Sequence, residues 1–337
     1  MSGRSVAVVG ATGAVGRAML EILASRRFPV DELRLFASSR SAGRKLETAF
    51  GEVVVEDLAE ADPKGIEIAL FSAGGDRSRA FAPRFAQAGA VVIDNSSAFR
   101  MDPSVPLVVV GVNDEAIKSQ RGIIANPNCT AMVLAMAAAP LHRAAGLSSL
   151  TATSYQSVSG SGQKGMDELT RQVRFFQGAP DTLVTGGWET PEHHVYPRPI
   201  GWNVVPWAGN PAADGYTDEE MKLRDESRKI LGLSELAVEP TVVRVPVMVG
   251  HGVAATLRFS RPLSPAEALA ALEQAPGVRV WSHRVATPLD AAGLDDVLVS
   301  RVRPTLGSPG GINLWAVGDN LRKGAALNAV QIAELLG

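Results

Sequence analysis

The sequence predicts an α/β protein of two domains. The first is a Rossmann-type, doubly wound parallel sheet, and the second is an α+β catalytic and dimerisation domain with a mostly antiparallel sheet. Three observations support this. The 337 residues are enough for about two domains of ordinary size. In the first third of the chain, short β-branched runs alternate with helical patterns. After about residue 128, longer strand-like runs with fewer helices replace that alternation.

The first domain contains a series of continuously apolar runs, which are typical of strands buried on both faces of a sheet. Directly after the first run, apolar residues recur three and four positions apart, which predicts a helix. The predicted strands cover residues 5–9, 33–36, 66–71, 90–94 and 107–112.

The second domain begins with a long apolar helix pattern over 130–145. Further helices are expected over about 164–177 and 217–231, on either side of a Pro- and Trp-rich stretch at 186–212. Longer strand-like runs follow, with the helical pattern SPAEALAALEQA among them. These runs are TVVRVPVMV, GVAATLRFS, VRVWS, DVLVSRVR and INLWAVGD.

The last helical pattern, over 320–336, is expected to return to the first domain. We therefore place a dinucleotide-binding domain at 1–128 plus 318–337. The catalytic, substrate-binding and dimerisation domain is placed at 129–317.

Composition and charge exclude several classes of protein. The formal net charge of −2 gives no general attraction to nucleic acid or to an anionic membrane. No stretch approaches the ~20 apolar residues that span a bilayer, and the N-terminal segment lacks the long apolar region of a signal peptide. A single cysteine excludes an internal disulfide, in keeping with a reducing compartment. We expect a cytoplasmic protein.

A glycine-rich motif, GATGAVG, follows the first predicted strand and opens the first predicted helix. Gly10 permits a tight turn, Gly13 lets the backbone approach a pyrophosphate, and Gly16 lets the helix pack closely on the strand. The pyrophosphate would lie at the helix N-terminus. The alternative is a glycine-rich turn without a ligand. The residues expected to contact the dinucleotide here are Gly10, Thr12, Gly13, Ala14 and Val15.

The end of the second predicted strand favours NADP over NAD. Proteins that bind NAD usually carry Asp or Glu there for the ribose 2′-hydroxyl, but this chain has Ala37 followed by Ser38, Ser39 and Arg40. Hydroxyls and a permanently charged guanidinium suit a 2′-phosphate. The alternative is that Arg40 is a solvated loop residue.

Cys129 follows Asn-Pro-Asn between a predicted strand and the long apolar helix. At the first turn of that helix, the dipole and the unpaired N–H groups favour thiolate over thiol. The same N–H groups suit an oxyanion formed when the sulfur attacks an acyl carbon. These features predict a nucleophile, and the alternative is a small buried cysteine.

A nucleophilic cysteine usually works with a base. His251 lies between two glycines, which leave room for a substrate. The alternative is a turn histidine exposed to water. His193 and His194 are adjacent, so they face opposite ways in an extended segment, and no other Cys or His cluster predicts a metal site.

Seven segments resemble bacterial aspartate-β-semialdehyde dehydrogenases and occur in that family's order along essentially the whole chain. They are GATGAVG, SSR, IDNSSAFR, NPNCT, SYQSVSGSG, EEMK and RVPVMVGHG. The resemblance implies NADPH-dependent reductive dephosphorylation of L-aspartyl-4-phosphate to L-aspartate-4-semialdehyde. That reaction serves the biosynthesis of lysine, threonine, methionine and diaminopimelate. The resemblance also implies a homodimer or a homotetramer.

The family's roles carry over to matching positions. The resemblance implies that Cys129 forms the acyl thioester, that His251 is the acid/base and that Gln156 orients the substrate. Arg244 would hold the α-carboxylate, for which a forked guanidinium is suited. The remaining assignments are Arg100, Asn128 and Lys222 for the phosphate, and Ser159, Gly160 and Asn320 for the cofactor.

Two neighbouring glutamates are distinguished by local helix chemistry. Thr217 and Glu220 form a capping-box pattern, in which Glu220 reaches back to the helix start. Glu219 and Lys222 are three apart and share a helix face, so Glu219 could meet the substrate ammonium while Lys222 meets its phosphate. Without the resemblance, a surface ion pair is the alternative.

The motif around Cys129 also bears on alternative functions. N-acetyl-γ-glutamyl-phosphate reductases share the two-domain plan, but their cysteine follows Pro-Gly and precedes Tyr. Glyceraldehyde-3-phosphate dehydrogenases carry Ser-Cys-Thr-Thr, which is also absent. A catalytically inactive relative that acts as a binding protein is a third possibility. The joint presence of Cys129, Gln156, Arg244 and His251 argues against it.

Overall fold

In the computed structural model, which describes residues 3–337, the chain forms two units. The main segment of the first unit ends at Asn128, and this unit also includes Arg228–Leu233 and Leu321–Gly337. The second unit consists of Cys129–Ser227 and Ser234–Asn320. Residues 318–320 belong to the second unit in this division, whereas the sequence predicts them in the first domain.

The first unit contains, within residues 3–337, a seven-stranded sheet in the order β3-β4-β2-β1-β5-β6-β7. Neighbouring strands are parallel except in the β3–β4 hairpin, so the predicted doubly wound parallel sheet is confirmed. The hairpin and β7 were not predicted. The strands are β1 (Arg4–Val9), β2 (Val30–Ala37), β3 (Lys45–Thr48), β4 (Gly51–Asp57), β5 (Ile68–Phe71), β6 (Val91–Asp94) and β7 (Ile123–Ala125).

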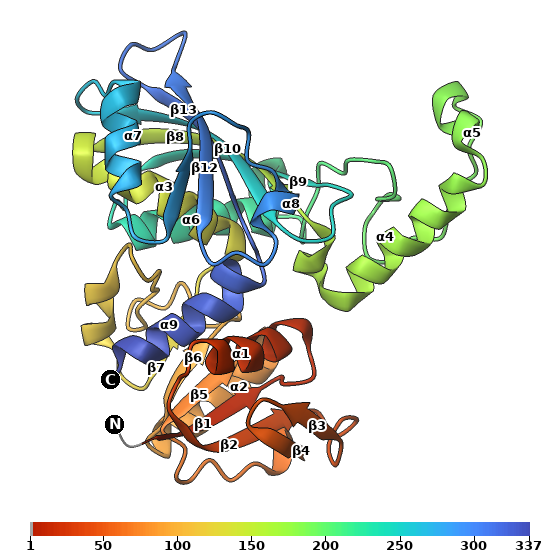
Figure 1. Ribbon diagram of the computed structural model, residues 1–337, viewed down its shortest axis with the longest axis vertical. Helices are drawn as coiled ribbons and strands as arrows, with labels where there is room; N and C mark the ends of the chain where they lie inside the picture. Colours follow the sequence, from red (N-terminus) through yellow and green to blue (C-terminus); the bar gives the residue numbers. More distant parts are fainter. Residues whose placement is uncertain (1–2) are drawn as a thin grey trace. The chain divides into compact units, whose positions relative to one another are not determined.

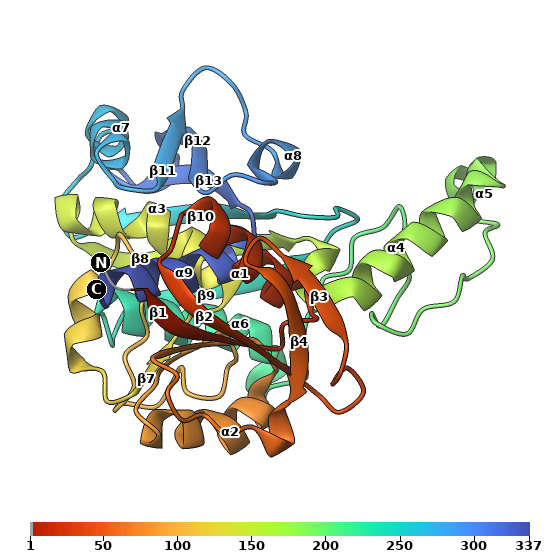
Figure 2. The same ribbon diagram turned by 60° about the horizontal axis from the view of Figure 1, so that its bottom comes forward.

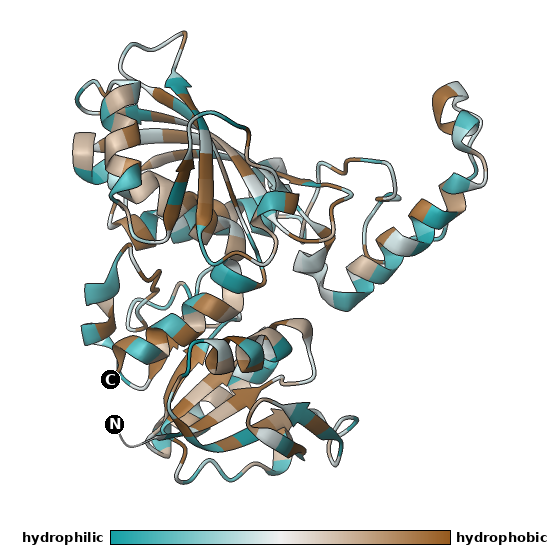
Figure 3. Ribbon diagram, in the orientation of Figure 1, coloured by the Kyte–Doolittle hydropathy of each residue, from teal (hydrophilic) through white to brown (hydrophobic). Residues whose placement is uncertain are grey.

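Helices cover both faces of this sheet (Figures 1 and 2). In β1, Val6 and Val8 pack with α1 (Ala14–Ser25) and α9 (Leu327–Leu335), whereas the alternate residues pack with α2 (Gly75–Gln87) on the other face. Because both faces are covered, the buried residues of the central strands β1, β5 and β6 are almost all apolar, as Figure 3 shows for the centre of the sheet.

The prediction of a strand over 107–112 is wrong. Apart from one bridge between Leu107 and Ala125, this buried segment forms no ladder among the described residues. Side chains satisfy its backbone instead. The Asn328 amide of α9 accepts from the Val110 N–H at 2.9 Å and donates to the Val108 carbonyl at 2.8 Å. A buried amide therefore replaces the neighbouring strand that the apolar run predicted.

Replacing Asn328 with alanine should destabilise the protein strongly. The substitution leaves the partly buried N–H of Val110 and the buried carbonyl of Val108 unpaired, and the buried carbonyl alone costs about 1–3 kcal/mol. Urea unfolding should show a midpoint well below that of the unmodified protein. Glu334→Gln on the same helix is the control, because its ion pair with Arg26 is partly exposed and worth at most ~1 kcal/mol. Equal effects of the two substitutions would show that Asn328 is not the anchor of this segment.

The second unit contains, in the described part of the chain, a six-stranded sheet in the order β11-β12-β13-β10-β8-β9. The sheet is mixed. Its three inner pairings are antiparallel as predicted, and both edge pairings, β11–β12 and β8–β9, are parallel. The strands are β8 (Leu147–Gln156), β9 (Ala237–Arg244), β10 (His251–Phe259), β11 (Val278–Trp281), β12 (Val297–Pro304) and β13 (Ile312–Gly318).

The helices of the second unit differ in their surroundings. The predicted apolar helix, α3 (Cys129–Ala145), is buried along almost its whole length and packs on β8, β10, β12, β13 and α7 (Pro265–Glu273). In contrast, α4 (Gly162–Gln177) and α5 (Pro180–Thr185) extend away from the sheet (Figures 1 and 2).

The other helices are α6 (Asp218–Leu231) and the short α8 (Pro288–Ala291). Among residues 3–337, no helix combines the length and the apolar character needed to cross a membrane.

Candidate active site

The topology of the second sheet brings three predicted site residues to one edge. Strands β8 and β9 run parallel and in register, so their last residues, Gln156 and Arg244, are paired neighbours. Strand β10 runs antiparallel to β8 and begins at His251, beside the end of β8. Three residues that are far apart in sequence therefore meet because two strands end where a third begins.

Cys129 is the first residue of α3 and is half-buried. The helix starts immediately after Asn126-Pro127-Asn128, as the sequence predicted. At this position the sulfur lies beside the N–H groups of the first turn, which carry the positive end of the helix dipole. That environment favours the thiolate, which is the nucleophilic form.

The Gln156 side chain is tied to the helix that carries the cysteine. Its Nε2 donates a hydrogen bond of 2.8 Å to Oγ1 of Thr130, the residue after Cys129, and the side chain is buried. Thr130 was not identified from the sequence. Only the NPNCT motif, which contains it, marked its position. This bond fixes the Gln156 amide relative to the start of α3.

His251 is fully buried, and its ring is held from the Nδ1 side. The backbone N–H of Ser157, the residue after β8, donates to Nδ1 at 3.1 Å. Burial and the positive charge of Arg244 lower the pKa of His251 from 6.5 to about 3, with a smaller opposing effect from the backbone of Gly250. The ring is therefore neutral at physiological pH.

Gly160 lies beside the Arg244 guanidinium and the His251 ring. A Cβ at this position would lie 2.7 Å from Nη1 of Arg244 and 3.1 Å from Nε2 of His251. A Cβ at this position would force the Arg244 guanidinium to shift and would press on the His251 ring, so glycine leaves the room that these two groups occupy. The Arg244 guanidinium is itself oriented by a hydrogen bond of 3.2 Å from Nη1 to the Ser157 carbonyl.

A buried polar network supports the loop around His251. Oδ1 of Asn320 accepts the N–H of Gly250 at 2.9 Å and a hydroxyl hydrogen from Ser159 at 3.0 Å, and it lies 3.0 Å from the Ser157 hydroxyl. The Asn320 amide in turn donates to Ser159 at 2.9 Å. Ser157 was not predicted, because its contact to His251 depends on the strand arrangement rather than on a motif.

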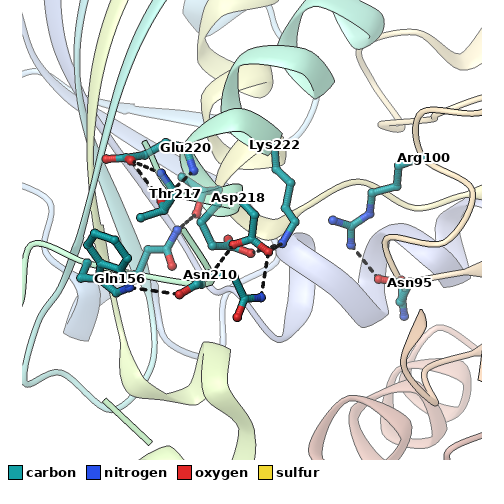
Figure 4. A network of polar contacts seen from close by, with 12 residues as sticks. Asn95, Arg100, Gln156, Asn210, Thr217, Asp218, Glu220 and Lys222 are labelled. Atoms are coloured by element: carbon teal, nitrogen blue, oxygen red, sulfur yellow. Dashed lines mark hydrogen bonds and ion pairs between the residues drawn. The ribbon is translucent and has the colours of Figure 1, made fainter. Parts of the chain in front are cut away.

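The first turn of α6 presents an ion-pair cluster (Figure 4). Nζ of Lys222 lies 2.7 Å from Glu219 and 3.2 Å from Asp218. Burial lowers the pKa of Lys222, but the two carboxylates outweigh it and the pKa is raised overall. Lys222 is thus a fixed positive charge, and Glu219 shares its helix face as predicted.

Glu220 has the structural role that its sequence position predicted. Its carboxylate accepts the N–H of Thr217 at 2.8 Å, while the Thr217 hydroxyl accepts the N–H of Glu220 at 3.3 Å, so the capping box is confirmed (Figure 4). The other carboxylate oxygen accepts the N–H of Val242 in β9 at 3.1 Å. Glu220 is therefore engaged on both sides, and of the two glutamates it is Glu219 that lies beside Lys222.

In the first unit, the glycine-rich loop has the geometry that a dinucleotide requires. Gly10 has φ +89°, and a Cβ there would lie 2.3 Å from the Ser72 carbonyl oxygen. A Cβ at Gly16 would lie 2.3 Å from the Gly10 carbonyl oxygen. No side chain among the described residues caps the first turn of α1, whose N-cap is Gly13. The loop and helix start therefore fit a pyrophosphate.

The predicted 2′-phosphate residues lie directly after β2. Ser39 and Arg40 are exposed in a turn that is closed by a hydrogen bond of 2.8 Å from the Ser41 N–H to the Ser38 carbonyl. With Ala37 at the strand end, this loop has no carboxylate to repel a phosphate. The position and chemistry of these side chains fit NADP.

Arg100 is buried and oriented by backbone carbonyls of the first unit. Its guanidinium donates to the carbonyl of Asn126 at 2.9 Å and to that of Asn95 at 2.7 Å. Figure 4 shows the contact with Asn95. Nζ of Lys229 donates to the Arg100 carbonyl at 2.7 Å and to two further carbonyls of the same loop. Asn128, another predicted phosphate residue, is also buried and directly precedes Cys129.

Two family models match the chain. A semialdehyde dehydrogenase NAD-binding domain matches residues 5–120, and a semialdehyde dehydrogenase dimerisation domain matches residues 138–323. Together they cover most of the sequence.

Similar proteins match along almost the full length. An aspartate-semialdehyde dehydrogenase of Streptomyces akiyoshiensis is 52% identical over 336 residues, which covers 98% of each chain. The structure of aspartate semialdehyde dehydrogenase II from Vibrio cholerae, complexed with ASA, is 44% identical with a TM-score of 0.93 and covers 100% of this chain and 98% of the other. The Candida albicans enzyme with NADP is 25% identical with a TM-score of 0.77 and covers 99% and 98%.

Proposed function

Because this chain belongs to the aspartate-semialdehyde dehydrogenase family, we propose that Cys129, Gln156, Arg244 and His251 form the active site of that activity. The reaction is the NADPH-dependent reductive dephosphorylation of L-aspartyl-4-phosphate to L-aspartate-4-semialdehyde. The observation that supports the site is the meeting of Gln156, Arg244 and His251 at one sheet edge, with Gln156 bound to the start of the cysteine helix.

Cys129 performs the covalent chemistry. Its thiolate attacks the acyl carbon of the substrate, and the carbonyl electron pair moves to oxygen. When that pair returns, the bond to the phosphate oxygen breaks and a thioester remains on Cys129. The N–H groups at the start of α3 and the Gln156 amide stabilise the negative charge on oxygen. NADPH supplies the hydride that reduces the thioester.

The remaining side chains hold the substrate. Arg244 binds the α-carboxylate through two parallel hydrogen bonds from its guanidinium, and Glu219 binds the ammonium group. Lys222, Arg100 and Asn128 bind the phosphate. This assignment gives every charged group of aspartyl phosphate a partner of opposite charge or a hydrogen-bond donor. The site is therefore expected to be specific, because a substrate that lacks one of these charged groups would leave a side chain of the site unpaired.

The cofactor is NADP. We assign its pyrophosphate to the loop containing Gly10, Thr12 and Gly13 and to the N-terminus of α1 at Ala14 and Val15. Ser39 and Arg40 are assigned to the 2′-phosphate, and Ser159, Gly160 and Asn320 to further cofactor contacts. The open first turn of α1 and the exposed guanidinium of Arg40 support these assignments.

Replacing Arg40 with aspartate should raise the Michaelis constant for NADPH far more than that for NADH. The substitution removes the cation that pairs with the 2′-phosphate and places a carboxylate in the same position. Steady-state kinetics with each cofactor measure the two effects. Arg44→Asp is the matched control, since Arg44 is exposed in the same loop. Equal increases in the Michaelis constants for NADPH and NADH would show that Arg40 does not bind the 2′-phosphate.

The reverse reaction tests the function directly. With semialdehyde, phosphate and NADP⁺, the protein should produce the absorbance of NADPH at a rate that depends on phosphate. N-acetyl-glutamyl semialdehyde should not replace the substrate, because its acylated nitrogen cannot form the ion pair assigned to Glu219. Correctly folded protein without activity would support a binding protein instead. Activity only on the acetylated semialdehyde would support the other reductase.

The protein acts as a homodimer and belongs to amino-acid biosynthesis, in which the semialdehyde leads to lysine, threonine, methionine and diaminopimelate. We place it in the cytoplasm, where its phosphorylated substrate and NADPH are available.

A further inference from the structure

Lys229, near the end of α6, bonds to three backbone carbonyls of one loop. Its Nζ donates to the carbonyls of Arg100 at 2.7 Å, Asp102 at 2.7 Å and Val105 at 2.9 Å. An ammonium group has three hydrogens, and these contacts can use all of them. Lys229 and the loop both belong to the first unit, because the Arg228–Leu233 segment is part of it. The sequence did not predict Lys229 as a site residue.

The conformation of this loop depends on a donor at that point. Residues 100–105 form neither a helix nor a strand. Within the loop, the N–H of Asp102 donates to the Phe99 carbonyl at 3.1 Å, and the N–H of Val105 donates to the Asp102 carbonyl at 3.2 Å. Three carbonyl dipoles directed at a single atom repel one another, and the positive charge of Lys229 offsets that repulsion. Without the ammonium group, we expect the loop to open.

An ion pair with the Asp102 carboxylate is the alternative role for Lys229. That carboxylate accepts the N–H of Ser104 at 2.8 Å and the Ser104 hydroxyl at 2.7 Å. These hydrogen bonds from Ser104 lower the pKa of Asp102, and the charge of Lys229 is a smaller cause. The carboxylate thus interacts mainly with its own loop, whereas Lys229 bonds to the backbone of that loop.

Arg100 is the residue through which the loop reaches the proposed phosphate site. Its guanidinium donates to the carbonyls of Asn95 and Asn126. These two residues directly follow β6 and β7, so the guanidinium lies at the carboxyl ends of those strands. The Arg100 carbonyl accepts from Lys229. Arg100 is therefore held at both its side chain and its main chain, and Lys229 provides the second contact.

The helix that carries Lys229 also carries Lys222. The two lysines are seven residues apart in α6, which is about two turns, so they lie on the same side of that helix. Lys222 and Arg100 are both assigned to the phosphate in the proposed function. The same helix thus provides one phosphate ligand directly and supports a second through Lys229.

We propose that Lys229 is a positioning residue for phosphate binding, which acts by holding the loop that carries Arg100. Its ammonium group bonds to backbone carbonyls, and its effect reaches the phosphate only through the Arg100 guanidinium. This role rests on the proposed function, because Arg100 is assigned to the phosphate there. A defect confined to phosphate is expected, since the residues assigned to the semialdehyde and to NADP are not in this loop.

Lys229→Met should lower kcat/KM for phosphate in the reverse reaction by about tenfold, the order expected when a hydrogen bond to a charged group is weakened. The KM for the semialdehyde and the dissociation constant of NADPH should stay nearly unchanged. Lys118→Met is the matched control, because it removes the same charge from an exposed residue of the same unit, where Lys118 pairs with Glu115. Equal losses for phosphate and semialdehyde would contradict the proposal.

A double-mutant cycle shows whether Lys229 acts through Arg100. Arg100→Leu alone should lower kcat/KM for phosphate strongly. Adding Lys229→Met to Arg100→Leu should then cause little further loss, because the residue that Lys229 positions is already absent. If the two losses instead multiply, Lys229 acts independently of Arg100 and the proposal is wrong.

Amide hydrogen exchange tests the holding role without an assay of activity. In Lys229→Met, residues 100–105 should exchange faster than in the unmodified protein, because the loop opens more often. Lys118→Met should leave this exchange unchanged. A phosphate defect without faster exchange would show that Lys229 acts by its charge alone, which would overturn the proposal. An inactive unmodified protein would contradict the proposed function, whereas an active one whose loop is unaffected by Lys229→Met would contradict the role of Lys229.

Discussion

Cys129→Ala should abolish turnover, by on the order of 10³-fold or more, while NADPH binding stays nearly intact. Without the sulfur no thioester forms, and the hydride has no acyl-enzyme to reduce. Binding should survive because the residues assigned to the dinucleotide do not include Cys129. Turnover is measured in the reverse direction, and binding is measured by the fluorescence of NADPH.

Cys129→Ser provides the matched comparison. Serine keeps the size and the hydrogen-bonding ability of the side chain, but its hydroxyl is a weak nucleophile without a strong base. Since a serine hydroxyl is far harder to deprotonate than a thiol, only a small residual activity is expected. Substantial turnover in Cys129→Ala would rule out the thioester mechanism.

The second large effect is expected at Arg244. Arg244→Leu should lower kcat/KM for the semialdehyde by on the order of 10²–10³-fold, because a buried charge-assisted pair with the α-carboxylate is lost. The kcat/KM of Arg244→Lys should lie between those of the unmodified protein and Arg244→Leu. Lysine keeps the positive charge but lacks the planar guanidinium that donates two parallel hydrogen bonds. Arg258→Leu is the control, because Arg258 is an exposed residue of β10.

A shortened substrate identifies the group that Arg244 binds. With 3-aminopropanal, which lacks the α-carboxylate, the unmodified protein and Arg244→Leu should have similar, low kcat/KM. If the substitution is as harmful with 3-aminopropanal as with the full substrate, Arg244 acts on the chemistry or the fold rather than on the carboxylate.

The sequence predicted those parts of the fold that depend on local patterns. Apolar runs with no alternation predicted the two-sided first sheet, because both faces of such strands are covered. The segment 107–112 has the same pattern, yet Asn328 provides the hydrogen bonds that a neighbouring strand would have provided. Hydropathy reports that a segment is buried, but it does not report which groups satisfy its backbone.

In the site, too, features that depend on neighbouring residues were predictable and long-range contacts were not. The glycines of the nucleotide loop and the Thr217–Glu220 capping box were predictable because their physics involves residues a few positions apart. The contacts of Thr130 with Gln156 and of Ser157 with His251 were not, since they arise only when β8 is placed between β9 and β10. A parallel pairing between β8 and β9 has no local signal, and it is this pairing that places Arg244 beside Gln156.

The contribution of Leu321–Gly337 to the first unit has a consequence for biosynthesis of the protein. Helix α9 covers one face of the first sheet and carries Asn328, which anchors residues 108–110. When the ribosome has completed the seven strands, α1 already covers part of that face, but the part that α9 covers is still open and stays open while residues 129–320 are made. At about 5–20 residues per second this takes on the order of 10–40 s. The nascent first unit must remain unaggregated for that time, and it is completed only after the second unit has emerged.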